Sequence, residues 1–202
     1  MTDPNQPYPQ QPPAKKKRKI WPWIVIGVPV LLFGGCTVAM VSAVGGDESA
    51  TVSSGSSDGG GAPAANSGPE FPGKLAKDTS AMAGDTITRD GLAYTVTPLE
   101  QGSSVVGDYM CSNVTIKNVG DKQNDFNGYI DWSMQDANGA IRDATYAPDH
   151  ELLESGQLAP GGQASGSVCF DARQGAASGT YVVLFKDTFS MSSDRVAWIN
   201  TI

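Results

Sequence analysis

Basic charge is scarce over most of this 202-residue sequence, which also has only one histidine and three cysteines. Residues 45–202 contain nine lysines and arginines against twenty acidic residues, a net charge of −11. Phosphate binding needs clustered lysine and arginine, so this acidic part excludes nucleic acid as a partner. The single histidine, His150, excludes a site built of several histidines and has no serine or cysteine partner pattern around it. We therefore predict no enzyme activity, no catalytic residue, no metal site and no cofactor.

Positive charge is concentrated instead at the end of residues 1–19, where an unbroken run of four lysines and one arginine begins at Lys15. The proline- and glutamine-rich stretch before this run has no apolar pattern, which is typical of a disordered tail. Residues 20–44 carry no charge. As a helix they would span roughly 37 Å, enough to cross a hydrocarbon core of about 30 Å. Because basic flanks stay in the cytoplasm, we predict a cytoplasmic tail and an extracytoplasmic C-terminal part.

Three interpretations of residues 20–44 remain open. We favour an uncleaved, single-pass transmembrane helix that contacts membrane lipid, because the segment is long enough to span. The sequence LLFGG before Cys36 resembles a lipoprotein box, in which Cys36 would be lipidated after cleavage. The sequence VSA at 41–43 also fits the small-residue rule of a signal peptidase, which would release a secreted protein. All three interpretations place the remainder outside the cytoplasm.

Glycine, serine, alanine and proline dominate residues 45–83. Such a composition buries too little apolar surface to offset the entropy of ordering, so we predict a flexible, disordered linker. The linker would separate the domain at residues 84–202 from the membrane and keep it within the cell envelope.

Residues 84–202 alternate short apolar runs with turn residues, a pattern that predicts strands. Leu92, Tyr94 and Val96 fall on one face of such a strand, and Asn138-Gly139 favours a hairpin turn. We predict eight strands, at 86–88, 92–99, 108–118, 129–136, 140–146, 163–171, 180–186 and 195–201. Many short strands without a convincing long helix predict an all-β fold, an antiparallel β-sandwich with Trp132 and Trp198 facing inward.

Cys111 and Cys169 make an even pair for an oxidising compartment. Val168 and Phe170 are expected to face inward, so Cys169 faces outward, and the same alternation turns Cys111 outward. If their strands are antiparallel neighbours, the two thiols can meet. We therefore predict a disulfide on the surface of the sheet, stabilising by up to about 4 kcal/mol on the chain-entropy model.

A resemblance to a known family lies in three stretches of this domain: GDTITRDGLAYTVTPLE, CSNVTIKNVGDKQNDF and LAPGGQASGSVCFD. They resemble the telokin-like, immunoprotective-antigen-like extracellular domains of Gram-positive bacteria, a family of unknown function common in actinobacteria behind an export segment or lipoprotein signal. The resemblance covers roughly residues 84–202. It implies an immunoglobulin-like β-sandwich at the cell envelope, and it supplies no catalytic residue.

The functional hypothesis is a membrane-anchored module that presents this domain to an unknown protein or cell-envelope partner. The alternative is a small-ligand or calcium-binding envelope lipoprotein anchored through Cys36. Acidic groups cluster at 121–125, 131–143 and 149–154. The stretch from Asp136 to Gly139 partly resembles a calcium-binding loop, but it lacks the residue spacing of that motif. A solvated acidic face is the simpler interpretation of these clusters.

Overall fold

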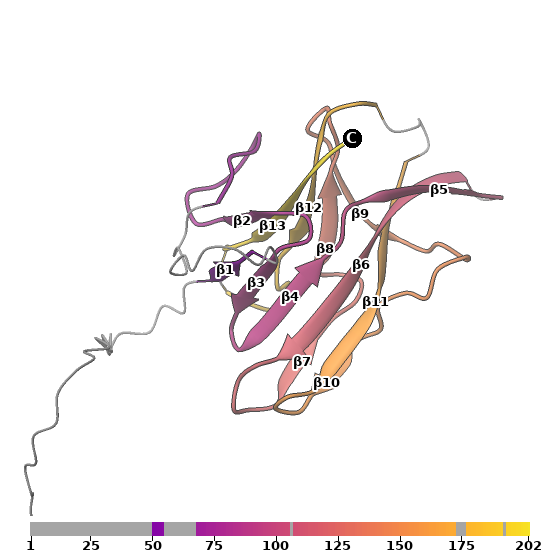
Figure 1. Ribbon diagram of the computed structural model, residues 1–202. Coiled ribbons are helices and arrows are strands. Elements are labelled where there is room, and N and C mark those ends of the chain that lie inside the picture. The colour runs from indigo at the N-terminus through magenta and orange to yellow at the C-terminus, as the bar shows by residue number, and fades with distance from the viewer. Residues whose placement is uncertain (1–49, 55–67, 106, 173–176, 192) are drawn as a thin grey trace, which may run out of the picture. The chain divides into compact units, whose positions relative to one another are not determined.

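The protein is seen here as a computed structural model that describes residues 50–54, 68–105, 107–172, 177–191 and 193–202. All regular secondary structure in these ranges is β-strand (Figure 1). No helix in the described part of the chain has the length and apolar character that crossing a membrane requires. The predicted cytoplasmic tail and membrane span, with Cys36, lie outside the described residues.

The described residues form two-layer β structure. The strands are β1 (Thr51–Ser53), β2 (Thr79–Met82), β3 (Thr86–Arg89), β4 (Leu92–Val96), β5 (Glu100–Ser104), β6 (Gly107–Asn118), β7 (Asn124–Phe126), β8 (Trp132–Gln135), β9 (Ile141–Thr145), β10 (Gly156–Leu158), β11 (Gln163–Asp171), β12 (Thr180–Phe185) and β13 (Val196–Thr201). Each of the eight ranges predicted from the sequence overlaps one of these strands, so those predictions are confirmed.

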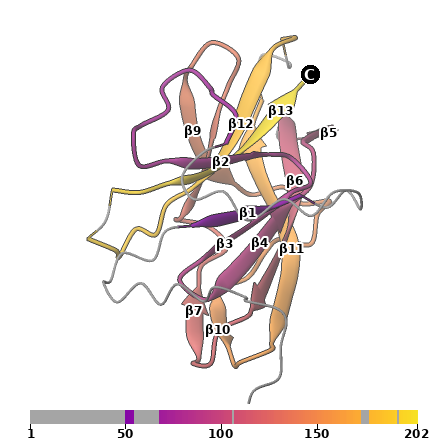
Figure 2. The ribbon, with the colours of Figure 1, turned by 60° about the vertical axis from the view of Figure 1, so that its left-hand side comes forward.

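One layer has the strand order β1-β3-β4-β6-β11, with β5 also paired to β6, and the other has the order β9-β8-β12-β13-β2. Strand β9 pairs with β11 through Ala144 and Thr145, so the layers are continuous at that edge. Figures 1 and 2 show β4, β6 and β11 side by side in the first layer and β12 beside β13 in the second. Strands β7 and β10 pair with each other as a small separate ladder. The predicted all-β sandwich is therefore confirmed.

Five further strands escaped the sequence analysis, because none has an apolar alternation of its own. Strand β5 is largely polar and exposed, and it forms because β6 continues past the end of β4 and offers it an edge. Strands β7 and β10 have three residues each and are defined by their mutual pairing.

The predicted linker needs a correction, because β1 and β2 lie within residues 45–83 and belong to the sandwich. Strand β2 pairs with β13 in parallel, whereas the sequence predicted antiparallel neighbours throughout. Phe71 packs on the outer face of the second layer against Val182 and Leu184. The buried carboxylate of Asp78 pairs with Arg195. A few anchoring contacts, invisible in the composition, therefore order residues 68–83.

Aromatic side chains fill the space between the layers at one end of the sandwich. Trp132 on β8 stacks on Trp198 of β13, with ring centroids 6.0 Å apart, and lies 5.0 Å from Phe185 of β12. Tyr94 of β4 contacts Phe185 at 4.8 Å. The indole N–H of Trp132 donates to the backbone oxygen of Asn127 at 2.9 Å. This cluster joins the two layers and fixes where β4 ends relative to β8 and β12.

We predict that Asp78→Asn lowers the free energy of unfolding by about 2 kcal/mol. The substitution removes the buried negative charge that pairs with the Arg195 guanidinium, and so leaves Arg195 without its charged partner. The matched control is Glu70→Gln in the same segment, since Glu70 pairs with Lys74 from an exposed position and should change stability by less than about 0.5 kcal/mol. Urea unfolding of both variants measures the difference. Equal effects of the two substitutions would contradict the anchoring role of Asp78.

Candidate functional site

A cavity of about 360 Å³ opens beside the turn between β3 and β4, and we call it the Tyr94 pocket. Its aromatic walls are the rings of Tyr94, Phe126, Phe185 and Phe189. Its acidic groups are Asp90, Asp125, Asp131 and Asp187. Segments from both layers and from β7 thus meet around one space.

The turn between β3 and β4 places Asp90 at the edge of this pocket. Asp90 and Gly91 have φ angles of 52° and 77°, the left-handed pair that closes a two-residue hairpin. A side chain at Gly91 would have to adopt this unfavourable φ and would come within 3.0 Å of the Asn124 amide nitrogen. That amide donates to the backbone oxygen of Asp90 at 3.1 Å. The hydrogen bond fastens β7, and with it Asp125 and Phe126, to the turn.

Tyr94 is the residue that links the core to the pocket. Its side chain is 5% exposed, and its ring packs on Phe185 and, edge-on, on Trp132. No residue in the described part of the chain hydrogen-bonds its hydroxyl group. Burial raises the pKa of this phenol far above its ordinary value; the carboxylates of Asp90, Asp131 and Asp187 act in the same direction, and Arg89 opposes them. The hydroxyl therefore faces the acidic side of the pocket as an uncharged group.

Asp131 and Asp187 are held in place by backbone amides. Asp131 is 8% exposed, and its Oδ1 accepts the N–H of Thr188 at 3.0 Å. The Oδ1 of Asp187 accepts the N–H groups of Phe189 and Ser190 at 2.9 and 3.1 Å. These contacts use one oxygen of each carboxylate. Among the described residues, no other hydrogen bond engages the second oxygen of either, so each retains capacity to accept one.

The pocket has a negative charge that its own walls do not neutralise. Among the described residues, its lining contains four aspartates and no lysine, arginine or histidine. Arg89, the last residue of β3, pairs with Asp90 at 2.9 Å and donates to the backbone oxygen of Asp194 at 2.8 Å. Arg89 therefore offsets one carboxylate of the four. Carboxylates, a phenol and aromatic faces are groups that can interact with a positively charged group or with hydrogen-bond donors.

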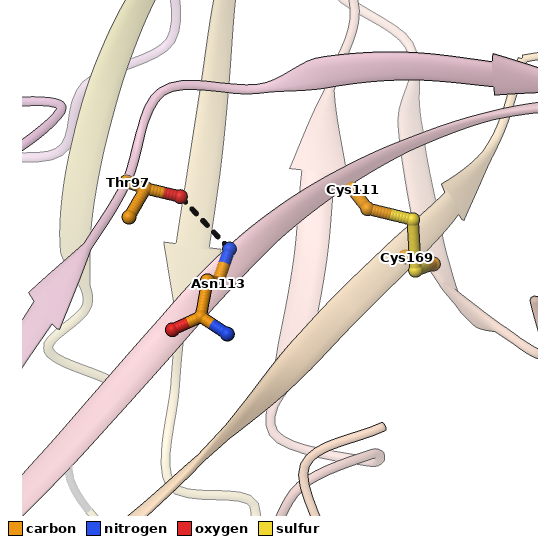
Figure 3. Close-up of a disulfide and its surroundings, with 4 residues drawn as sticks. All are labelled: Thr97, Cys111, Asn113 and Cys169. Carbon is orange, nitrogen blue, oxygen red and sulfur yellow. Dashed lines mark hydrogen bonds between the residues drawn. A yellow bond between two sulfur atoms is a disulfide. The ribbon is translucent and has the colours of Figure 1, made fainter. Parts of the chain in front are cut away.

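The structure joins Cys111 and Cys169 by a disulfide (Figure 3). The two residues are register partners on the antiparallel strands β6 and β11, with Cα atoms 4.1 Å apart. Both face away from the main core, but the predicted surface position is wrong, because Cys111 and Cys169 are only 3% and 1% exposed. Ala147 and Leu152 cover them from a segment that hydrogen-bonds along β11.

Close to the disulfide, Figure 3 also shows how β6 changes partner. The backbone N–H of Asn113 donates to Oγ1 of Thr97 at 2.9 Å, and the N–H of Thr97 donates to the backbone oxygen of Asn113. This reciprocal contact lies between the last β4 residue and the first β5 residue. The Thr97 hydroxyl thus supplies a hydrogen bond to β6 in the gap between the pairing of β4 and the pairing of β5, where the chain turns away from β6 at Pro98.

His150 lies beside the disulfide, and the three residues are the one group of candidate metal ligands in the described ranges. The sulfur atoms of Cys111 and Cys169 are bonded to each other, however, which removes the thiolates that metal binding needs. The imidazole ring meets Tyr109 edge-on at a centroid distance of 5.3 Å. In the oxidised protein, His150 therefore packs over the sulfur bridge as a covering side chain.

The calcium-like stretch from Asp136 to Gly139 is a hairpin turn whose carboxylate is already engaged. Oδ1 of Asp136 accepts the N–H groups of Asn138 and Ala140 at 3.0 and 2.9 Å, and Oδ2 accepts a hydrogen bond from Arg142 at 3.1 Å. Burial alone would raise the pKa of Asp136, but these hydrogen bonds outweigh it and hold the pKa below the ordinary value of 3.8. The stretch stabilises the β8–β9 connection.

Sequence reasoning missed the Tyr94 pocket, because its four aspartates lie in four separate segments. Asp125 and Asp131 belong to acidic clusters whose simpler interpretation is a solvated face, and Asp187 lies outside those clusters. The signal that was available is the alternation of acid and aromatic residues at Asp125-Phe126 and again at Phe185, Asp187 and Phe189.

We predict that Tyr94→Phe changes the free energy of unfolding by less than about 0.5 kcal/mol, because the hydroxyl that it removes opens on the pocket and has no partner among the described residues. Tyr181→Phe is the matched control, since the Tyr181 hydroxyl is similarly buried but donates to the backbone oxygen of Ala177 at 3.0 Å. That control should lose about 1 kcal/mol. Urea unfolding distinguishes them, and destabilisation by Tyr94→Phe would show that its hydroxyl has a partner after all.

We also predict that Asp136→Asn lowers stability by about 1 kcal/mol at pH 7, because the amide cannot attract Arg142 as the carboxylate does. The pKa of Asp136 is depressed in the folded protein, so its charged form contributes stability above the unfolded value of 3.8. That contribution is lost as pH falls below this value. Unfolding free energies of wild type and variant should therefore converge in acid, and a difference that is constant down to pH 2 would contradict the assignment.

The fold is similar to solved bacterial structures at low sequence identity. The yjhA protein of Bacillus subtilis is 17% identical, with a TM-score of 0.47, and the match covers 59% of this chain and 97% of that one. The secreted protein MPT63 of Mycobacterium tuberculosis is 14% identical, with a TM-score of 0.41 and coverages of 56% and 82%. An uncharacterised β-sandwich protein of Clostridium difficile 630 is 11% identical, with a TM-score of 0.44 and coverages of 65% and 98%.

No curated protein matches the sequence. A family match is found, and it extends from β2 to the start of β13, over residues 82–196. This range is more than half of the chain and contains every aspartate of the Tyr94 pocket. The chain therefore belongs to the family described as Domain of unknown function (DUF4352).

Proposed function

We propose that this protein is a non-catalytic binding module that presents an immunoglobulin-like β-sandwich outside the cytoplasm and accepts a ligand or partner group in the Tyr94 pocket. The observation that carries the proposal is Tyr94, which is 5% exposed, lines the pocket among its carboxylates and has no hydrogen bond from the described residues to its hydroxyl group. The hydroxyl group opens on the pocket, so a ligand that enters can form a hydrogen bond with it in place of water.

The composition of the pocket favours binding over catalysis. Its lining offers carboxylates, amides and aromatic rings, and among the described residues it has no serine, cysteine, lysine or histidine, the side chains that most often act as nucleophile or general base. Asp131 and Asp187 are fixed by backbone amides, which preorganises them as acceptors. Preorganised acceptors reduce the entropy cost of binding.

The disulfide supports an extracytoplasmic position, because such bonds form and persist in oxidising compartments. The basic run before residues 20–44 supports an anchor with the N-terminus inside. An uncleaved helix in membrane lipid is the form we propose, and lipidation of Cys36 is the alternative. The partner would be a protein or another component of the cell envelope.

The test is site-specific photocrosslinking of the full chain in its native cells. Phe189, 81% exposed at the pocket rim, is replaced by p-benzoyl-phenylalanine, and Tyr146, 67% exposed outside the pocket, receives the same group as control. We expect an adduct from position 189 that is absent from position 146 and is lost when Asp131→Asn is introduced. The same products from both positions, or none from 189, would overturn the proposal.

A further inference from the structure

The charge and the free hydroxyl of the Tyr94 pocket together point to one class of ligand. Four aspartates line the space, and Arg89 offsets one of them. Acidic residues alone would be an ordinary solvated surface. Tyr94 adds an independent observation, because its side chain is 95% buried, lines the cavity and has no hydrogen-bond partner in the described ranges. The occupant therefore carries positive charge and has a donor for the phenol oxygen.

An inorganic cation does not fit this arrangement. Calcium and magnesium need several oxygen ligands converging on one point. Within the described part of the chain, no three of the pocket aspartates bring their oxygens close enough to hold one ion. Backbone amides also occupy one oxygen of Asp131 and one of Asp187. Two carboxylates with one free oxygen each and one phenol oxygen are too few ligands for these ions, but they match the three N–H donors of an ammonium group.

The aromatic rings indicate what the rest of the ligand is. Phe185 is 6% exposed and forms the inner wall with Tyr94, while Phe189 is 81% exposed at the rim. A cation is attracted to the faces of such rings. A methylene chain that packs against the rings removes apolar surface from water, which favours binding. A space of about 360 Å³ is at the small end of the range for ligand pockets.

We infer that the Tyr94 pocket binds a primary ammonium group on an alkyl stem, with the stem between the aromatic rings, the ammonium hydrogens donated to Asp131 and Asp187, and one donated to the Tyr94 oxygen. This inference rests on the proposed function and names the ligand class of that site. The shared chemistry is that of a free alkyl diamine and of a lysine side chain on a polypeptide.

The experiment measures binding to the full chain in detergent micelles by calorimetry, with 1,6-diaminohexane as the probe. 1-Hexanol has the stem without the charge, and calcium chloride supplies the charge without the stem. We expect saturable binding of the diamine alone. Asp131→Asn should weaken it about tenfold, since the amide keeps the acceptor for Thr188 but loses the charge. Tyr94→Phe should weaken it several-fold.

Asp143→Asn is the matched control, because Asp143 is an exposed acid on β9 outside the pocket and its loss changes net charge equally. It should leave diamine affinity unchanged. Equal weakening by Asp143→Asn would reduce the effect to general attraction between charges. Binding of hexanol as tight as that of the diamine, or displacement of the diamine by millimolar calcium, would also overturn the inference.

Two further arms separate the sources of the ammonium group. Nα-acetyl-lysine methylamide and an acetylated hexalysine peptide are titrated beside the diamine. Tighter binding of the lysine probes identifies a basic polypeptide as the source, and tighter binding of the diamine identifies a free amine; both support the ligand class. If no amine binds while photocrosslinking at position 189 succeeds, the ligand class is wrong and the binding function stands.

Discussion

The pairing of β6 with β11 is the constraint on which the rest of this structure depends. Every residue of β11 has a register partner on β6, from Gln163 opposite Lys117 to Asp171 opposite Tyr109. Because side chains alternate along a strand, this register sends Val114, Val168 and Phe170 into the core and turns both cysteines to the other face. A slip of one residue would exchange those faces. The sulfur bridge between opposite positions therefore fixes the same register that the core requires.

Strand β6 also sets the position of Tyr94, whose register partner is Ile116 in the second half of the strand. It is longer than any neighbour in its layer, so β4 pairs with its second half and β5 with its first. Tyr94 is consequently held where its ring packs in the core and its hydroxyl emerges at the acidic end. The same side chain therefore belongs to the core and lines the Tyr94 pocket.

The parts of the fold that could be predicted from the sequence are those whose signal is local. Alternation located the eight strands, Asn138-Gly139 marked a hairpin, and Trp132 and Trp198 are buried as their positions in the pattern indicated. The contributions of Phe71 and Asp78 could not be predicted, because their partners lie more than a hundred residues further along the chain. The packing of Ala147 and Leu152 over the disulfide could not be predicted either, because it too is a contact between separate segments of the chain.

The pocket illustrates this limit more sharply. Asp90, Asp125, Asp131 and Asp187 are brought to one cavity by the turn geometry at Gly91 and by the contact of Asn124 with that turn. Each acid taken alone is an unremarkable loop residue. Only the pairing order of the strands shows that they share a space, and that order depends on contacts between distant segments.

The bond between Cys111 and Cys169 closes a loop, with the two residues 58 positions apart, and the pocket is assembled from both sides of it. Asp125, Phe126 and Asp131 lie inside the loop, whereas Tyr94 and Phe185 lie outside. A protease that cuts the chain once between the cysteines leaves two fragments that are still covalently joined. The residues that line the pocket therefore stay on one covalently joined molecule after a single cut anywhere between Cys111 and Cys169.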